Sequence, residues 1–247
     1  MIGLLKSFGF PFKPSIRINS KESLENAARS LGILPFFPNN IKGLSVEELC
    51  APGMLFGGNY DEGCWEWKGP VIRKRTTAYG KFFRRKAGFV SLELLPEFLN
   101  FRRSVYPIKS GTTDEMLLEI IKENDSLSST ELKALIFGGR KRRDWTDLPD
   151  SEEYPLLKSK SKSIESPLQR LQMGGWIVIS DFEYKQTKRG ERYGWGVARY
   201  STPELLFGDL LENSTSLTPE ESFSNILDYL KKRIPGVSKQ SLEQLLK

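Results

Sequence analysis

The spacing of apolar residues along the chain changes period near residue 175. Leu168 and Leu171 have helical spacing, and the pairs Ser166-Pro167 and Gly174-Gly175 are suited to begin and end a short helix. From residue 176 apolar and polar positions alternate as in a strand, break at 185–190 and alternate again up to 197. The pattern predicts a short helix that leads directly into a β-hairpin.

Two more helices are predicted upstream of this segment. Thr112 with Glu115, and Ser128 with Glu131, have the spacing of capping boxes in front of apolar helical faces. Helix, short link, helix, helix and hairpin is the order of elements in a winged helix. A polar, basic insertion at about 140–165 delays the third helix, and its composition predicts a mobile loop.

The flanking segments carry signals for further helices and strands. Ser20 and Ser45 are suited to cap helices, and the aromatic, glycine-rich stretch 60–91 predicts several short strands, followed by a helix up to Arg103. Tail helices are predicted to begin near residues 202, 218 and 238. We therefore predict an α+β protein with a mixed N-terminal domain at 1–109, a winged-helix domain at 110–202 and a C-terminal helical extension at 203–247.

Polar side chains on the predicted helix and hairpin form the first candidate site. With the two leucines packed inward, Gln169, Arg170 and Gln172 point outward, and amide and guanidinium groups can read base edges in a major groove. Cations near the hairpin tip are suited to contact phosphates: Lys185, Lys188, Arg189 and Arg192. The same cations also fit a solvated hairpin end that keeps a sheet edge soluble.

Composition narrows the classes of activity and partner. The 247 residues carry a net charge of +6 and include no histidine, which removes the commonest neutral-pH acid–base group and metal ligand. Residues 68–109 hold 11 Lys and Arg against 2 Asp and Glu, a concentration of positive charge that is compatible with a polyanionic partner. Cys50 and Cys64 are predicted to be a reduced pair. With no signal peptide and no long apolar run, the sequence predicts a cytoplasmic protein without a membrane span.

A second candidate site centres on Trp65-Glu66-Trp67. On a predicted strand the two indoles share a face, where they can stack on an extruded base beside a carboxylate that acts as general base. The same tryptophans also fit a buried strand face. Tyr79, Lys81 and Arg102 are assigned to the same pocket, and Lys81, Arg84, Arg85 and Arg102 can line an anion-binding groove. Asp61, Glu62 and Glu66 do not have the spacing of a metal loop, so neither metal nor cofactor is expected.

Several short motifs resemble those of one protein family, the AlkZ-related proteins. These are winged-helix proteins akin to bacterial alkylpurine DNA glycosylases. The resemblance covers most of the chain from about residue 65, in Trp65-Glu-Trp67, Ala78-Tyr-Gly-Lys-Phe-Phe83, Lys86-Ala-Gly-Phe-Val-Ser91, Arg102-Arg103, Leu168-Gln-Arg-Leu-Gln172, Tyr193-Gly-Trp195 and Tyr200-Ser-Thr-Pro-Glu204. The glycosylases carry an N-terminal Gln-x-Gln or Gln-x-Asp motif. Here the first glutamine is Gln169, so no catalytic residue is assigned.

These observations favour a winged-helix protein that binds nucleic acid without catalysis. DNA is the expected partner and RNA the alternative. A second hypothesis is a base-processing, glycosylase-like hydrolase that uses carboxylates of the N-terminal domain. A third is a winged helix that serves as a protein-interaction module, because a fold does not by itself fix a function.

Overall fold

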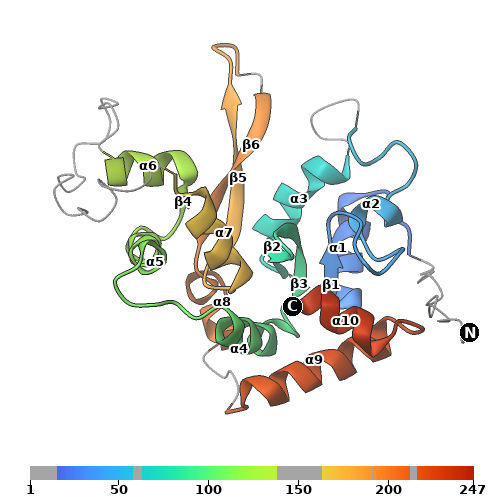
Figure 1. Cartoon of the computed structure of the whole chain (residues 1–247). Coiled ribbons are helices and arrows are strands. Elements are labelled where there is room, and N and C mark those ends of the chain that lie inside the picture. The colour runs from blue at the N-terminus through green and yellow to red at the C-terminus, as the bar shows by residue number, and fades with distance from the viewer. Residues whose placement is uncertain (1–15, 58–62, 138–162, 191, 212–215) are drawn as a thin grey trace, which may run out of the picture.

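Two three-stranded antiparallel sheets, each covered by helices, make up the described part of the chain (Figure 1). The computed structural model describes residues 16–57, 63–137, 163–190, 192–211 and 216–247. Mixed helices and small antiparallel sheets confirm the α+β class. In these residues no helix has the length and apolarity needed to cross a bilayer.

The first sheet has the strand order β1-β3-β2 and is built from the N-terminal half. Ser20 and Ser45 cap the first two helices through their hydroxyls, as their positions predict. The elements of this half are α1 (Lys21–Leu31), β1 (Ile33–Pro35), α2 (Val46–Leu49), α3 (Cys64–Arg73), β2 (Thr77–Phe83), β3 (Lys86–Ser91) and α4 (Leu95–Val105).

The segment around Trp65-Glu66-Trp67 is helical, so its prediction as a strand is wrong. The alternation of two tryptophans about one glutamate is local, whereas the buried positions Cys64, Trp67, Lys68 and Val71 follow the period of a helix. As a result the two indoles do not share a face. Of the strands predicted within 60–91, β2 and β3 are present.

Cys50 and Cys64 form a disulfide, which corrects the prediction of a reduced pair. The bond joins the residue after α2 to the first residue of α3. The two cysteines are 14 positions apart in the sequence, and this spacing alone does not indicate that the chain brings them together. The cytoplasmic location stays a prediction.

The second sheet has the strand order β4-β6-β5. Strands β5 and β6 form the predicted hairpin, whereas β4, between α5 and α6, was not predicted. Thr112 caps α5, and the Ser128 hydroxyl accepts the Glu131 N–H in the first turn of α6. The predicted helix before the hairpin is confirmed but begins at Glu165, so Ser166 is not its cap. The insertion at 140–165 lies almost wholly outside the described residues. The elements are α5 (Thr113–Glu123), β4 (Leu127–Ser128), α6 (Ser129–Phe137), α7 (Glu165–Met173), β5 (Val178–Gln186) and β6 (Arg192–Ser201).

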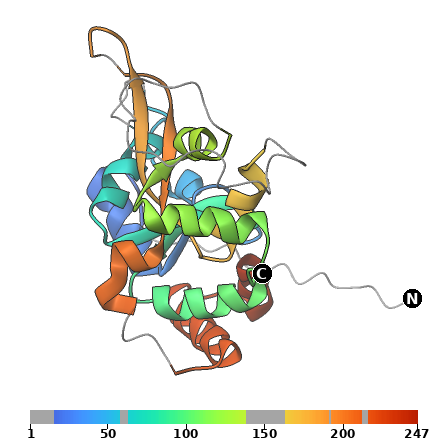
Figure 2. The same ribbon diagram turned by 90° about the vertical axis from the view of Figure 1, so that its left-hand side faces the viewer.

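The tail helices pack on the N-terminal half. They are α8 (Pro203–Leu211), α9 (Pro219–Arg233) and α10 (Lys239–Leu246). Helix α9 lies beside α4 (Figure 2). Phe101 and Phe223 stack between these helices with ring centroids 4.3 Å apart. Apolar residues of α9 and α10 belong to the same buried cluster as those of α1 and the first sheet, whereas α5, α6 and α7 share a second cluster. The division of the chain at residues 109 and 202 stays a prediction.

Arg102 on α4 connects the N-terminal half, α7 and the tail. Its side chain is fully buried, and its guanidinium donates to the carbonyls of Met173 at 2.7 Å, of Phe82 at 3.1 Å and of Leu246. The guanidinium also lies 4.6 Å from the ring centroid of Tyr106. Burial lowers the pKa of Arg102, but the three carbonyls compensate much of the cost of burying a cation.

Substitution of Arg102 should destabilise the whole fold. Arg102→Met leaves three buried carbonyls without their donor, so we expect a loss of about 3 kcal/mol or more in the free energy of unfolding, measured by urea titration. Arg102→Lys should not restore the loss, because an ammonium lacks the planar fork that reaches three separate acceptors. Arg189→Met, at an exposed position, is the matched control. A loss in Arg102→Met no larger than in this control would contradict the role of Arg102.

Candidate nucleic-acid interface

The β5–β6 hairpin projects beyond the helices on one side of the molecule (Figure 1). Lys185, Lys188 and Arg189 are exposed at its tip, and no ion pair is seen for them within the described residues. The tip turns at Gly190, whose φ of 82° lies in the region that favours glycine. Arg192 is exposed and its guanidinium lies 5.0 Å from the ring centroid of Tyr184. The four predicted phosphate contacts therefore do lie together at this end of the hairpin.

Helix α7 offers less polar surface than predicted. Gln172 is buried, so its prediction as an outward residue is wrong: its amide donates to the Leu168 carbonyl, and its oxygen accepts the Lys81 N–H at 3.1 Å. Arg170 is exposed but makes two hydrogen bonds to Asp114, at 2.8 and 2.6 Å. Gln169 is half-buried. The amide and guanidinium groups predicted to read bases are thus engaged within the protein at two of three positions.

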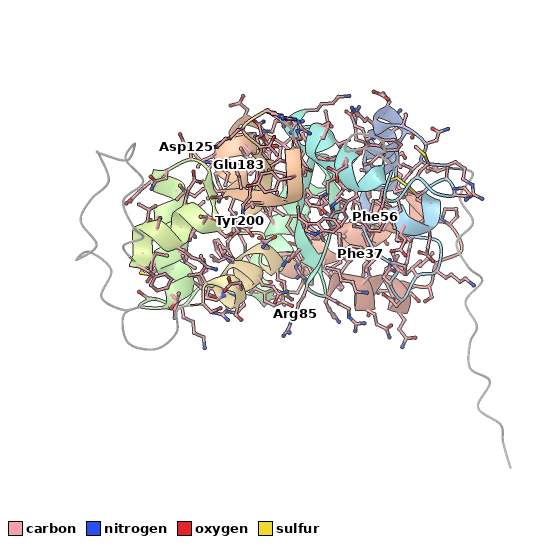
Figure 3. The ribbon with its side chains drawn as sticks, turned by 90° about the horizontal axis from the view of Figure 1, so that it is seen from above. Phe37, Phe56, Arg85, Asp125, Glu183 and Tyr200 are labelled. Atoms are coloured by element: carbon pink, nitrogen blue, oxygen red, sulfur yellow. A yellow bond between two sulfur atoms is a disulfide. The ribbon has the colours of Figure 1, made fainter. Side chains whose placement is uncertain are left out.

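Trp65 lies at the centre of an aromatic cluster that connects the two halves. Its ring centroid is 5.6 Å from that of Phe36, 5.6 Å from that of Phe56 and 5.5 Å from that of Trp195 on β6. Trp65 itself is half-buried, and Phe56 and Trp195 are exposed. Figure 3, which views the molecule from above, shows Phe56 and Phe37 together on the side of the N-terminal helices. The cluster is accessible to solvent on the hairpin side.

The carboxylate beside this cluster already has a partner. Glu66 accepts a hydrogen bond from the Tyr184 hydroxyl at 2.8 Å. Partial burial and the Glu66 carboxylate together raise the pKa of Tyr184. Trp67 is buried, in agreement with the alternative that these tryptophans belong to the core. Trp65 is partly exposed, as the hydrolase hypothesis requires. Asp61 and Glu62 lie outside the described residues.

Of the other residues assigned to this pocket, Tyr79 lies beside the aromatic cluster, with its ring centroid 6.5 Å from that of Phe36, but it is buried against Phe89 and Phe182, and burial raises its pKa. Lys81 is exposed on β2. The prediction that Arg102 lines a pocket or groove is wrong, because its guanidinium is buried among backbone carbonyls. Arg84 and Arg85 are exposed at the β2–β3 turn.

Lys68 is a feature that sequence reasoning missed. Its side chain is buried under the aromatic cluster, with Nζ 3.8 Å from the ring centroid of Trp65 and 4.6 Å from that of Phe182. The ammonium donates to the Trp65 carbonyl. Burial lowers the pKa of Lys68 to about 8, although the nearby Glu66 opposes the change. On a helix, Trp65 and Lys68 are three residues apart and therefore neighbours on one face. The prediction of a strand for this segment placed them on opposite faces, so the contact was not expected.

No group of three or more potential metal ligands occurs in the part of the chain that the structure describes. The exposed groups of this hairpin that can contact a ligand are cations and aromatic rings. Cations contact phosphates, and ring faces stack on bases.

Comparisons with known proteins identify the family. The AlkZ-related family model matches residues 18–247, so the chain belongs to this family and the resemblance seen in its motifs is confirmed. No curated protein matches the chain. Among solved structures the chain is similar to Streptomyces sahachiroi DNA glycosylase AlkZ, with 11% identity and a TM-score of 0.45, over 95% of this chain and 60% of that one. The chain thus spans less than two thirds of the length of this structural neighbour.

Lys68 should make the stability of the fold depend on pH. Its folded pKa of about 8 lies below the unfolded value of 10.5, so between these values the unfolded chain binds more protons and the free energy of unfolding rises with pH. The rise attributable to this group is on the order of 3 kcal/mol. Lys68→Met lacks the titration. We expect its free energy of unfolding, relative to wild type, to fall as the pH of urea titrations is raised through this window.

The matched control for this titration is Lys185→Met, which removes an exposed lysine from the hairpin. Other groups that titrate in the same window are shared by wild type and both variants and cancel in the differences. A relative stability of Lys68→Met that follows the control at every pH would contradict a buried amine with a lowered pKa.

Proposed function

We propose that this member of the AlkZ-related family binds DNA with its second half, α5 to β6, acting as a winged helix. The order of elements from α5 to β6, and the sheet order β4-β6-β5, support this assignment. In this interpretation α7 is the helix in front of the wing, and the β5–β6 hairpin is the wing. The relation to AlkZ DNA glycosylases supports DNA as the partner.

The observation that carries the proposal is the exposed, cationic end of the hairpin. Lys185, Lys188 and Arg189 are exposed, have no ion pair within the described residues and belong to a hairpin that projects beyond the helices (Figure 1), so contact with phosphates would break no existing salt bridge. A phosphate contact also releases condensed counterions, which favours binding at low salt. Arg192 adds a fourth charge next to Tyr184.

Binding through this surface should depend weakly on base sequence. Gln172 is buried and Arg170 is paired with Asp114, which leaves Gln169 as the predicted base-reading residue that has neither role. Phosphate contacts position a protein on DNA but do not distinguish bases. We therefore propose that sequence preference is small and rests on Gln169.

Charge reversal at the hairpin tip tests the proposal. The double variant Lys188→Glu/Arg189→Glu removes two phosphate contacts, so we expect weaker binding to all duplexes alike. The slope of log K against log salt should decrease in magnitude by about 2. Fluorescence anisotropy with duplexes of unrelated sequence, over a series of salt concentrations, measures both effects. Binding that is absent in the wild type even at low salt would exclude the function.

The matched control is the double variant Lys231→Glu/Lys232→Glu on α9. Both lysines are exposed and the change in net charge is the same, but α9 lies at the opposite end of the molecule from the hairpin tip (Figure 1). An equal loss of affinity in the two double variants would show a general effect of net charge and would contradict a specific role for the hairpin.

We further propose that binding is not coupled to base excision. The glutamine motif of the alkylpurine DNA glycosylases has no counterpart before Gln169, and the Glu66 carboxylate accepts a hydrogen bond from the Tyr184 hydroxyl. Incubation with alkylated duplex DNA under conditions where the protein binds should therefore release no free base, as measured by chromatography. Release that is lost in Glu66→Gln, with DNA affinity retained, would instead establish the hydrolase hypothesis.

A further inference from the structure

Trp195 is the most exposed large apolar side chain in the described part of the protein. It is 69% exposed, while Phe56 is 55% exposed and Tyr193, on the same strand, is 46% exposed. Phe56 and Trp195 both contact Trp65. Single exposed apolar residues are ordinary in proteins, but a group of aromatic rings at one place marks a binding surface.

The backbone around Trp195 presents this ring to solvent. Glu183 pairs with Val197 and Lys185 pairs with Tyr193, so a single residue, Tyr184, lies opposite the three residues Gly194, Trp195 and Gly196. This is an enlarged β-bulge, a device that changes the direction of a side chain. Gly194 has a φ of 73°, and a Cβ on Gly196 would lie 2.9 Å from the Tyr184 ring. Glycine is therefore required on both sides of Trp195.

The contact with Trp65 holds Trp195 in place but leaves at least one of its ring faces open. The two rings are T-shaped, with an interplanar angle of 86°. In such a pair either the edge of Trp195 meets the face of Trp65 or the reverse, so at least one face of Trp195 is not covered by Trp65. Lys68 contacts Trp65 from within the protein and supports this arrangement. The contact with Trp65 thus restricts the rotation of the Trp195 indole.

Cations stand next to the exposed rings. Lys185 is the cross-strand partner of Tyr193, and Arg192 precedes Tyr193 and lies over Tyr184. Paired residues of two antiparallel strands have their Cβ atoms about 5 Å apart. Successive residues of a strand point to opposite faces, so Lys185 with Tyr193 lies on one face of the hairpin and Arg192 with Tyr184 on the other. Tyr184 bonds to Glu66 on α3 and Trp195 contacts Trp65 on α3, so Arg192 is the cation on the face of Trp195. An exposed ring beside a cation is the combination that binds unpaired nucleotides through base stacking and phosphate contacts.

We propose that the aromatic surface formed by Trp195 and Phe56 around Trp65 binds an unpaired base of DNA, which stacks on the open face of Trp195. The inference rests on the proposed DNA binding and specifies its substrate: DNA with unpaired bases, bound in preference to continuous duplex. Every base has an aromatic face, so the stacking tolerates any sequence. The phosphates that flank the base contact Arg192 and the cations of the hairpin tip.

The test compares three labelled DNAs of the same length: a duplex, a duplex with a central unpaired segment, and a single strand. Wild-type protein should bind the two DNAs with unpaired bases more tightly than the duplex, as measured by anisotropy. Trp195→Ala should weaken binding to these two about 5- to 150-fold and leave duplex binding unchanged. Trp195→Phe, which keeps a stacking ring, should retain most of the affinity.

Leu205→Ala is the matched control, because Leu205 is an exposed apolar residue on α8. It should change binding to none of the three DNAs. A second measurement follows tryptophan emission: unpaired DNA should quench wild type more than Trp195→Phe, because a stacked base quenches the indole. Far-UV circular dichroism of each variant confirms that it is folded.

The outcomes separate this inference from the proposed function. If Lys188→Glu/Arg189→Glu weakens binding to all three DNAs while Trp195→Ala changes none of them, the inference is wrong and DNA binding by the hairpin stands. An equal loss on duplex and unpaired DNA in Trp195→Ala also overturns it. If no DNA binds to the wild type, both proposals fail.

Discussion

The position of the hairpin depends on one buried guanidinium. Arg102 comes from α4, and its three acceptors come from the end of α7, the end of α10 and the strand β2. The carbonyls at the C-terminal end of a helix lack partners within the helix and carry partial negative charge, so two of the acceptors are where a cation is best stabilised. Burial of the arginine therefore requires that these segments meet. Because one guanidinium bonds to all three segments, α7 packs on the N-terminal half only when the tail also packs there, and the reverse holds as well.

A series of polar contacts extends this connection from α7 to the hairpin. The Gln172 side chain on α7 accepts the Lys81 N–H of β2. On β5, the Ser180 carbonyl accepts a hydrogen bond from the Arg75 guanidinium at 2.8 Å. Arg73 with Asp181, and Tyr184 with Glu66, continue the contact between α3 and β5. The base of the hairpin is thus anchored to the N-terminal half along much of β5, whereas the tip beyond it carries the cations. An anchored base fixes the direction in which the proposed DNA contacts point.

Features of the fold that have a local cause could be predicted from the sequence. Three such features depend only on residues that are neighbours in the sequence: the hairpin, the helix before it, and the helix caps at Ser20, Ser45 and Thr112. Gln172 and Arg102 could not be predicted in the same way, because their partners lie far away in the chain: Gln172 bonds to Lys81, and Arg102 bonds to Leu246. A polar side chain next to a buried leucine is the same in sequence whether water or a distant backbone group satisfies it.

The burial of Gln172 and Arg102 has a consequence for recognition. Gln172 and Arg102 were expected to contact a ligand, but the protein uses their donors internally, so the polar groups that distinguish bases are depleted on this surface. What remains exposed are charges on the hairpin and the rings of Trp195, Tyr193 and Phe56, and neither kind of group distinguishes one base from another well. A surface of this composition binds the charged backbone and unpaired bases of DNA, and it depends little on the base sequence. The arrangement that stabilises the fold therefore also limits the kind of specificity that the proposed interface can have.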